Sequence, residues 1–309
     1  MNTSKSPRKV AMTAWIIGQQ SLPAYAHRFA PKKFTQPQLF ACLVLKAFFH
    51  TDYRGIVTYL RDMPELCQSI ELGKVPHFTT LHKAAGRLLR FHVVRRLLDS
   101  AVRRVMNRRR HVPRAAVDSS GFEAGQVSPY FIKRRSRLPS LWQTTTYTRF
   151  PKLAIVCDCQ THLILAAHPA RGPTPDVNQL LATLRQCVAH VKIDRLIADA
   201  GYDSESNHQT LRQAHGVITI IPPKHGRPTT KPAAGKYRRL MQRLFRRPER
   251  IRYGQRWQVE TVFSMIKRNL SHAIAAHTYW PQCREMLLLA LTHNVMICFA
   301  ELRFSTEQS

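Results

Sequence analysis

The order of strand-like and helix-like segments after Pro113 restricts the fold more than any other feature of the chain. Four apolar runs predict strands, the second of them a hairpin that turns at 160–162: RAAVDSSGF, KLAIVCDCQTHLILAAHPARG, DRLIADAGYDS and GVITIIPP. Amphipathic stretches at 175–191 and before Ala214 predict helices between the later strands. This order predicts an α/β domain with a mixed sheet flanked by helices.

Residues 1–112 carry helical patterns instead. FTQPQLFACLVLKAFF predicts a buried helix with Thr35 as its N-cap, and YRGIVTYLRDMPEL predicts an amphipathic helix ended by Pro64. A third helical stretch follows, for which Thr79 or Thr80 is the expected N-cap. The first part of the chain is therefore predicted to be an all-helical region.

Positive charge dominates the composition. The chain has 48 Lys and Arg against 18 Asp and Glu, a formal charge of +30 and a pI of about 10.8. So much like charge opposes compaction unless a polyanion lies nearby, and it exceeds what solubility requires. A domain this basic is typical of proteins that bind nucleic acids.

Two basic segments are candidates for DNA contact. Ten arginines and one acid lie between Arg87 and Arg114, on predicted helices with a cap and a turn between them. This pattern favours a helix-turn-helix-like DNA-binding region, and a solvated basic face on a helical bundle is the alternative. A basic insert at 223–252 interrupts the second predicted region, 113–305, and is either a mobile charged loop or an arm that contacts phosphate.

Other features limit the compartment. Seven cysteines are scattered without the spacing of a zinc site or a disulfide framework, which fits a reducing cytosol. No signal-peptide pattern follows the basic N-terminus. The longest apolar run near the C-terminus is interrupted by Thr292, His293 and Asn294, so we expect no membrane span.

Acidic residues are scarce, so their positions are informative. Asp118 ends the first predicted strand and Asp199 ends a later one. Carboxylates at the ends of neighbouring buried strands lie at the rim of the sheet, where open α/β sheets hold ligands. Mg²⁺ is commonly bound by one or two carboxylates together with substrate phosphate, so Asp118 and Asp199 are candidate ligands of a divalent cation. Among the other aspartates, Asp176 and Asp203 are expected to cap helices, and Asp158 is expected within a strand.

Glu260 lies in the segment RYGQRWQVETVFSMIKRNL. At a helical step of about 100° per residue, five polar residues share an arc of about 80°: Tyr253, Arg256, Glu260, Ser264 and Lys267. An apolar stripe beside this arc is expected to pack on the sheet: Val259, Val262, Phe263, Ile266 and Leu270. Such a helix directs Glu260 toward the strand ends. The alternative is an exposed ion pair with Arg256, which contributes little to stability.

These residues resemble a known family. The segment is similar to the Y-R-E-K signature of bacterial insertion-sequence DDE transposases of the "insertion-sequence four" group: Tyr253-x2-Arg256-x3-Glu260-x6-Lys267. DAGYD at Asp199 resembles that group's second-aspartate motif, and VDSSGF at Asp118 resembles its first. The resemblance covers residues 113–270 in register. It implies a ribonuclease-H-like core that cuts transposon-end DNA and joins it to target DNA.

The family implies roles for particular residues. It implies two divalent ions, Mg²⁺ or Mn²⁺, held by a triad: Asp118, Asp199 and Glu260. It implies side chains that hold transposon-end DNA and the phosphate near the scissile bond: Tyr253, Arg256 and Lys267. It also implies double-stranded DNA as partner, a homodimer or larger assembly that brings two ends together, and a place in the bacterial cytoplasm, at the nucleoid.

The sequence departs from the family in one respect. The best-studied members carry a long strand-rich insertion where only 61 positions separate Asp199 from Glu260 here, which puts their hairpin-forming mode of end processing in doubt. Trp257, and Trp142 with Tyr147, are candidates for stacking on an unpaired base, with core packing as the alternative. Two other functions remain open: a metal-dependent nuclease without strand transfer, and a catalytically silent DNA-binding protein derived from a transposase.

Overall fold

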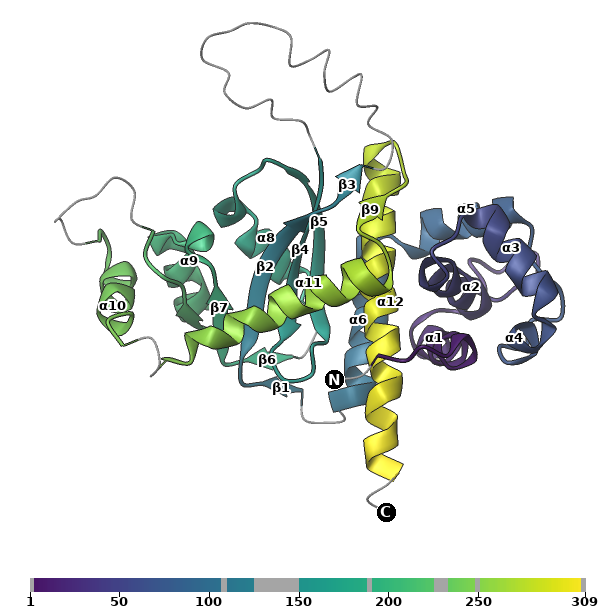
Figure 1. Ribbon diagram of the computed structural model, residues 1–309, viewed down its shortest axis with the longest axis horizontal. Coiled ribbons are helices and arrows are strands. Elements are labelled where there is room, and N and C mark those ends of the chain that lie inside the picture. Colours follow the sequence, from purple (N-terminus) through teal and green to yellow (C-terminus); the bar gives the residue numbers. More distant parts are fainter. Residues whose placement is uncertain are drawn as a thin grey trace, which may run out of the picture.

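The computed structural model describes residues 3–106, 110–124, 150–187, 191–224, 233–247 and 251–306, with 299–306 as backbone only (Figure 1). Trp142 and Tyr147 lie outside the described residues. A central sheet has helices on both sides in Figure 1, and a long helix near the C-terminus stands between this sheet and the helices that begin the chain.

The central sheet has five strands in the order β5-β4-β2-β7-β8. The strands are β2 (Ala115–Gly121), β4 (Phe150–Asp158), β5 (Ile164–Gly172), β7 (Arg195–Ala198) and β8 (Ile218–Ile220). β4 pairs antiparallel with both β2 and β5, while β7 pairs parallel with β2 and β8. The predicted mixed sheet flanked by helices is confirmed.

Two further parallel pairs of short strands form separate two-stranded sheets. The first joins β1 (His111–Val112) to β6 (Lys192–Ile193), and the second joins β3 (Glu123–Ala124) to β9 (Ala273–Ile274). The second pair ties the chain just after β2 to the segment just after α11, so the ends of these two elements stay together.

β4 and β5 form the predicted hairpin. The Asp158 carboxylate accepts hydrogen bonds from the backbone amides of Gln160 at 3.1 Å and Thr161 at 3.2 Å. His162 closes the turn in a left-handed conformation with φ 59°. Asp158 therefore shapes the turn at the end of its strand, a common use of a short acidic side chain.

Helices cover the sheet. α11 (Trp257–Asn269) packs on β2 and β4, and α8 (Leu180–Arg185) packs on β4 and β5. The predicted apolar stripe of α11 is buried as expected: Val259, Val262, Phe263, Ile266 and Leu270. The predicted helix ending at Ala214 is present as α9 (Glu205–Gln209), continued by a π-helical turn (Thr210–Ala214).

The basic insert contains a helix that its sequence did not predict, α10 (Lys236–Leu244). Glu205 accepts hydrogen bonds from the backbone amides of Tyr237 and Arg238, both at 3.0 Å, at the start of this helix. The Arg238 guanidinium also lies 2.7 Å from the buried carboxylate of Asp203. The described part of the insert is thus held against the domain by two acids that lie soon after Asp199 in the sequence, Asp203 and Glu205.

The described residues of the N-terminal region form six helices: α1 (Pro7–Ser21), α2 (Gln36–Phe48), α3 (Tyr53–Asp62), α4 (Pro64–Gln68), α5 (Phe78–Leu88) and α6 (Phe91–Met106). Thr35 caps α2 as predicted, in a reciprocal capping box with Gln38. Pro64 does follow the end of α3, and it also begins α4.

The predicted N-cap of α5 was wrong. The helix begins at Phe78 and is capped by His77, whose Nδ1 accepts a hydrogen bond from the backbone amide of Thr79 at 3.4 Å. A neutral imidazole nitrogen accepts a hydrogen bond as a hydroxyl does, so neither Thr79 nor Thr80 is needed as the cap.

The long helix α12 (Tyr279–Thr306) is shared between the two parts of the chain. It packs against α1, α2 and α6 as well as against β5 and α11. The Asn294 side chain bonds to both the backbone amide and the carbonyl of Ile164, each at 2.8 Å, and so anchors the helix on β5. Within the described ranges no helix is long and apolar enough to cross a membrane. The boundary between 1–112 and 113–305 stays a prediction.

Candidate active site

Strand register brings Asp118 and Asp199 together. On the parallel strands β2 and β7, Val117 pairs with Ala198, and each aspartate is the next residue along its strand. Residues at matching positions of paired strands point to the same face, so the two carboxylates are neighbours. Asp199 also caps the turn that follows, since its Oδ1 accepts from the backbone amide of Ala200 at 2.5 Å. The rim of the sheet that holds these two residues is called the carboxylate rim below.

The carboxyl group of Asp118 is largely buried. Burial raises its pKa from 3.8 to about 6, and the nearby carboxylates of Asp176 and Asp199 add to the shift. A hydrogen bond from the Ser119 amide, 2.8 Å from Oδ1, and the Arg256 guanidinium, 3.7 Å from Oδ2, oppose it. The positive charge around Asp118 is therefore too small to offset its burial, which favours the binding of a further cation.

Glu260 is connected to the carboxylate rim through Arg256. The two guanidinium nitrogens of Arg256 lie 2.6 Å from Glu260 Oε1 and 3.7 Å from Asp118 Oδ2. The Glu260 side chain is 51% exposed, and that of Arg256 is 19% exposed. The ion pair considered from sequence is present, but it forms one half of a bridge between two predicted metal ligands.

Tyr253 and Arg256 do not lie on the helix that carries Glu260. They form a 3-10 turn, and α11 begins only at Trp257. The preceding Arg252 adopts a left-handed conformation, φ 53°, which a right-handed helix excludes. The predicted helical arc was therefore wrong for its first two members, although Arg256 still reaches Glu260.

The other side chains predicted to bind DNA, those of Tyr253, Lys267 and Trp257, differ from one another in burial and in the groups that they contact. Burial raises the pKa of Tyr253; the neighbouring Arg256 opposes this shift and the two rim aspartates add to it. The Lys267 ammonium donates to Ser120 Oγ at 2.8 Å and lies 5.5 Å from the centre of the Phe122 ring. The Trp257 side chain is 70% exposed, so it does not pack in the core.

Asp176 is a functional candidate that sequence reasoning missed. It was expected to cap the next helix, yet α8 has Gln179 at its N-cap position. Its carboxylate instead accepts from Ser119 Oγ at 2.5 Å and lies 2.6 Å from Lys152 Nζ. A signal existed, because β5 runs parallel to β2 and ends at the same rim, just before Asp176. A third acid at a strand end was thus visible in the sequence.

Asp203 has a structural role. The predicted cap was wrong, since Ser204 occupies the N-cap position of α9. The Asp203 side chain is fully buried and accepts from the Lys224 amide and from Arg238 Nε, each at 2.8 Å. Burial alone would raise the pKa of Asp203, but hydrogen bonds from His208, Arg238 and Lys224 outweigh it and lower that pKa.

The donor atoms at the carboxylate rim suit a hard divalent cation, because they are carboxylate oxygens. The buried hydroxyl of Tyr202 beside them has no hydrogen-bond partner among the residues that the structure describes. Burial raises the pKa of Tyr202, and the carboxylates of Asp176, Asp118 and Asp199 add to this. In the present arrangement, no three His, Cys, Asp or Glu side chains among the described residues lie close enough to share one ion. Metal binding by the predicted triad therefore requires Arg256 to release Glu260.

The fold defines the class of the protein. A five-stranded mixed sheet with its second strand reversed, and with aspartates within the first strand and directly after the fourth, is that of a ribonuclease-H-like domain. Residues 113–295, more than half of the chain, match the family model described as transposase DDE domain, and the chain belongs to this family. A search of curated proteins found no match.

The family match confirms the predicted transposase class and tests its details only in part. Asp118, Asp199 and Glu260 all fall within the matched residues. The family is one of phosphoryl-transfer enzymes that act on DNA and typically use divalent metal ions. The Y-R-E-K subgroup and the roles of individual residues stay predictions.

Proposed function

We propose that the chain is a transposase that cuts transposon-end DNA and joins the freed 3′ end to target DNA, with Mg²⁺ or Mn²⁺ as cofactor. One observation carries the proposal: the register of β2 and β7 sets Asp118 beside Asp199, and Arg256 connects them to Glu260. The family match supports the class of reaction.

Asp118, Asp199 and Glu260 would hold two ions, with Asp176 as an additional carboxylate beside them. Ions in such a site activate a water or a 3′-hydroxyl and stabilise the leaving oxygen of an in-line displacement. Ser119 orients two of the acids at once, because its amide donates to Asp118 and its hydroxyl donates to Asp176.

The cations of the site would hold the DNA backbone. In the DNA-free protein Arg256 pairs with Glu260 and lies near Asp118, and ions bound to these carboxylates would free its guanidinium for a phosphate. Lys267 donates to the neutral hydroxyl of Ser120, so its charge is available to a phosphate. The exposed ring of Trp257 offers an unpaired base a surface on which to stack, and Tyr253 lies beside Arg256.

We further infer a homodimer or larger assembly on DNA, because two transposon ends have to be joined in one event. The helical residues 1–112 would contact DNA outside the active site, and the basic helix α10 would add phosphate contacts. The site of action would be the bacterial cytoplasm, at the nucleoid.

The decisive test is Glu260→Gln in a cleavage and strand-transfer assay with Mn²⁺. We expect cleavage to fall at least about a thousandfold, as when a transition-state contact is removed, while DNA binding is retained. Glu123→Gln is the matched control, since the Glu123 side chain is 78% exposed. Undiminished cleavage by Glu260→Gln would overturn the triad. Cleavage by the parent without joining of a pre-cut 3′ end would identify a nuclease, and DNA binding without either reaction a silent derivative.

A further inference from the structure

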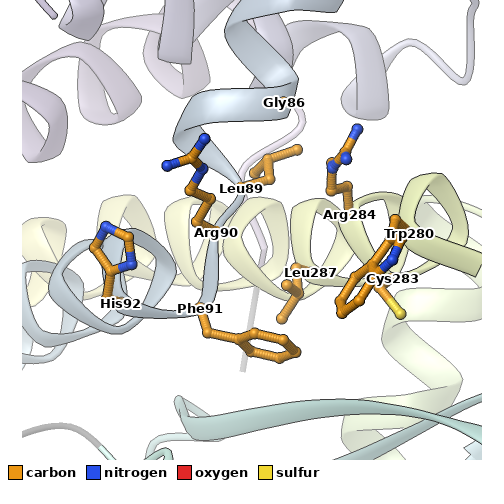
Figure 2. A pocket seen from close by; sticks show the side chains of 9 residues that line it. All are labelled: Gly86, Leu89, Arg90, Phe91, His92, Trp280, Cys283, Arg284 and Leu287. Atoms are coloured by element: carbon orange, nitrogen blue, oxygen red, sulfur yellow. The ribbon is translucent and has the colours of Figure 1, made fainter.

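A pocket of about 430 Å³ lies where the turn between α5 and α6 meets the first turns of α12. Figure 2 shows Arg90 and Arg284 on opposite sides of this pocket, with Gly86 above them and the rings of Phe91 and Trp280 below. These five residues define what we call the Arg–Trp pocket. Its volume falls within the range of small-ligand sites.

The charge of the Arg–Trp pocket suits an anion. No carboxylate is among the described residues that line it, and His92 adds a third basic group. The acid nearest in sequence, Glu285, is engaged elsewhere, because its oxygens accept from the backbone amides of Ala275 at 3.1 Å and Ala276 at 3.0 Å. Two guanidinium groups without a carboxylate between them are well suited to a phosphate.

The aromatic side of the pocket suits a base. Trp280 is 60% exposed, which is unusual for the largest apolar side chain. Its ring centre lies 5.1 Å from that of Tyr279, and the Arg171 guanidinium lies 4.4 Å from the centre of the Tyr279 ring. A braced and exposed indole offers a flat surface on which any nucleobase can stack.

Contacts connect the Arg–Trp pocket to the candidate active site. The carbonyl of Arg171, the residue that covers Tyr279, accepts from Thr174 Oγ1 at 2.7 Å. The carbonyl of Thr174 accepts from Lys152 Nζ at 3.2 Å, and Lys152 is paired with Asp176 at 2.6 Å. A DNA strand that follows this series of contacts from the carboxylate rim would reach Trp280.

We propose that the Arg–Trp pocket binds one unpaired nucleotide of a DNA strand, with its phosphate between Arg90 and Arg284 and its base against Trp280. The inference rests on the proposed function only in taking DNA as the ligand, and its test needs no cleavage. An acidic protein segment would use the same arginines without needing the indole, so the two occupants are separable.

The experiment measures binding of fluorescent oligothymidylate to the full chain in EDTA. We expect Trp280→Leu to weaken binding about tenfold, because stacking on an aromatic side chain contributes about 1–3 kcal/mol per base. Trp280→Phe keeps a ring and should stay close to the parent. Arg284→Gln should lower the slope of log affinity against log salt by about 0.7, the contribution of one phosphate of a single strand.

Gly86 supplies a second and independent pair of variants. A Cβ at this position meets only Arg284 Nη1, at 3.9 Å, so a side chain is accommodated. Gly86→Glu should place a carboxylate in the pocket and weaken oligothymidylate binding, whereas Gly86→Ala should leave it unchanged. Parent-like binding by both Trp280→Leu and Gly86→Glu would overturn the proposal. So would competition by polyglutamate that Gly86→Glu abolishes while oligothymidylate binding persists. If Glu260→Gln still cleaves DNA but Trp280→Leu loses oligothymidylate, the pocket stands without the proposed triad.

Discussion

The aspartates Asp118 and Asp203 are both shielded from solvent, with side chains 23% and 0% exposed, and their surroundings differ in kind. Asp203 Oδ2 receives hydrogen bonds from Arg238 and a backbone amide, His208 Nε2 lies 3.5 Å from Oδ1, and the pKa of Asp203 is lowered. Asp118 receives one amide hydrogen bond and a more distant guanidinium, and its pKa is raised to about 6. The positive charge and hydrogen bonds around Asp203 outweigh its burial, whereas those around Asp118 do not.

This difference indicates a structural role for Asp203 and a ligand-binding role for Asp118. A compensated carboxylate stabilises the fold by itself, whereas an uncompensated one destabilises the fold until a cation arrives. Burial is therefore a poor guide to the role of an acid in this chain. The positive charge around each carboxylate is the better guide, and the same substitution at the two positions tests it.

The largest effect is expected for Asp203→Asn. Breaking the buried pair with Arg238 should lower the free energy of unfolding by about 3 kcal/mol or more, because Arg238 is left without its partner. Urea unfolding at pH 7 measures this loss. Since the folded pKa of Asp203 lies below 3.8, the stabilisation is present above pH 3.8 and is lost as the pH falls through the folded value. Parent-like stability at pH 7 would contradict the structural role.

Asp118→Asn should change the free energy of unfolding in the opposite direction and raise it. The folded pKa of Asp118 is raised from 3.8 to about 6, so this group costs the metal-free parent no stability below pH 3.8 and destabilises it as the pH rises through about 6. The variant removes this loss and should be more stable by roughly 2 kcal/mol at pH 8, allowing for partial exposure of the side chain. Unfolding in EDTA from pH 4 to pH 8 tests the prediction, and parallel curves for parent and variant would refute it.

The smallest effect is expected at Arg256, which lies between the carboxylates of Asp118 and Glu260. Arg256→Gln removes the charge that competes for Asp118 and Glu260, so Mn²⁺ should bind the DNA-free protein several-fold more tightly, about 1 kcal/mol. Titration calorimetry measures this change. Lys267→Gln is the control, because Lys267 contacts a hydroxyl and its loss should leave Mn²⁺ affinity unaltered. Equal affinities for parent and Arg256→Gln would show that the bridge does not compete with metal.

The sheet was predictable because its signals are local. Each strand is an apolar run followed by a turn signal, and Asp199 directly follows its strand as predicted. The predicted end of the first strand at Asp118 was wrong, because β2 continues to Gly121 in its ladder with β4. Thr35 capped its helix as predicted because a capping box needs only residues three apart. Local pattern therefore sufficed for the fold class and for the positions of two rim aspartates.

The contacts that distinguish one acid from another were not predictable, because they join distant parts of the chain. Asp176 contacts Ser119, which lies 57 residues earlier, and Asp203 contacts Arg238, 35 residues later. The same holds for a buried polar residue of α12: His293 Nε2 donates to the carbonyl of His162 at 3.1 Å, and burial lowers the pKa of His293 to about 4. No periodicity within a short window reports such partners.

The shared helix α12 has a consequence for how this protein is made. The helix contributes to both the N-terminal region and the sheet, and the Ser4 amide donates to the carbonyl of Met296 at 3.0 Å. A ribosome synthesises α12 after all the strands that the structure describes, so the apolar surfaces of β5 and the first helices stay uncovered until α12 is made. In a chain that stops before Tyr279, the N-terminal helices and the sheet would both keep apolar surface exposed and would be open to proteolysis. Loss of α12 should therefore lower the amount of folded protein rather than a single activity.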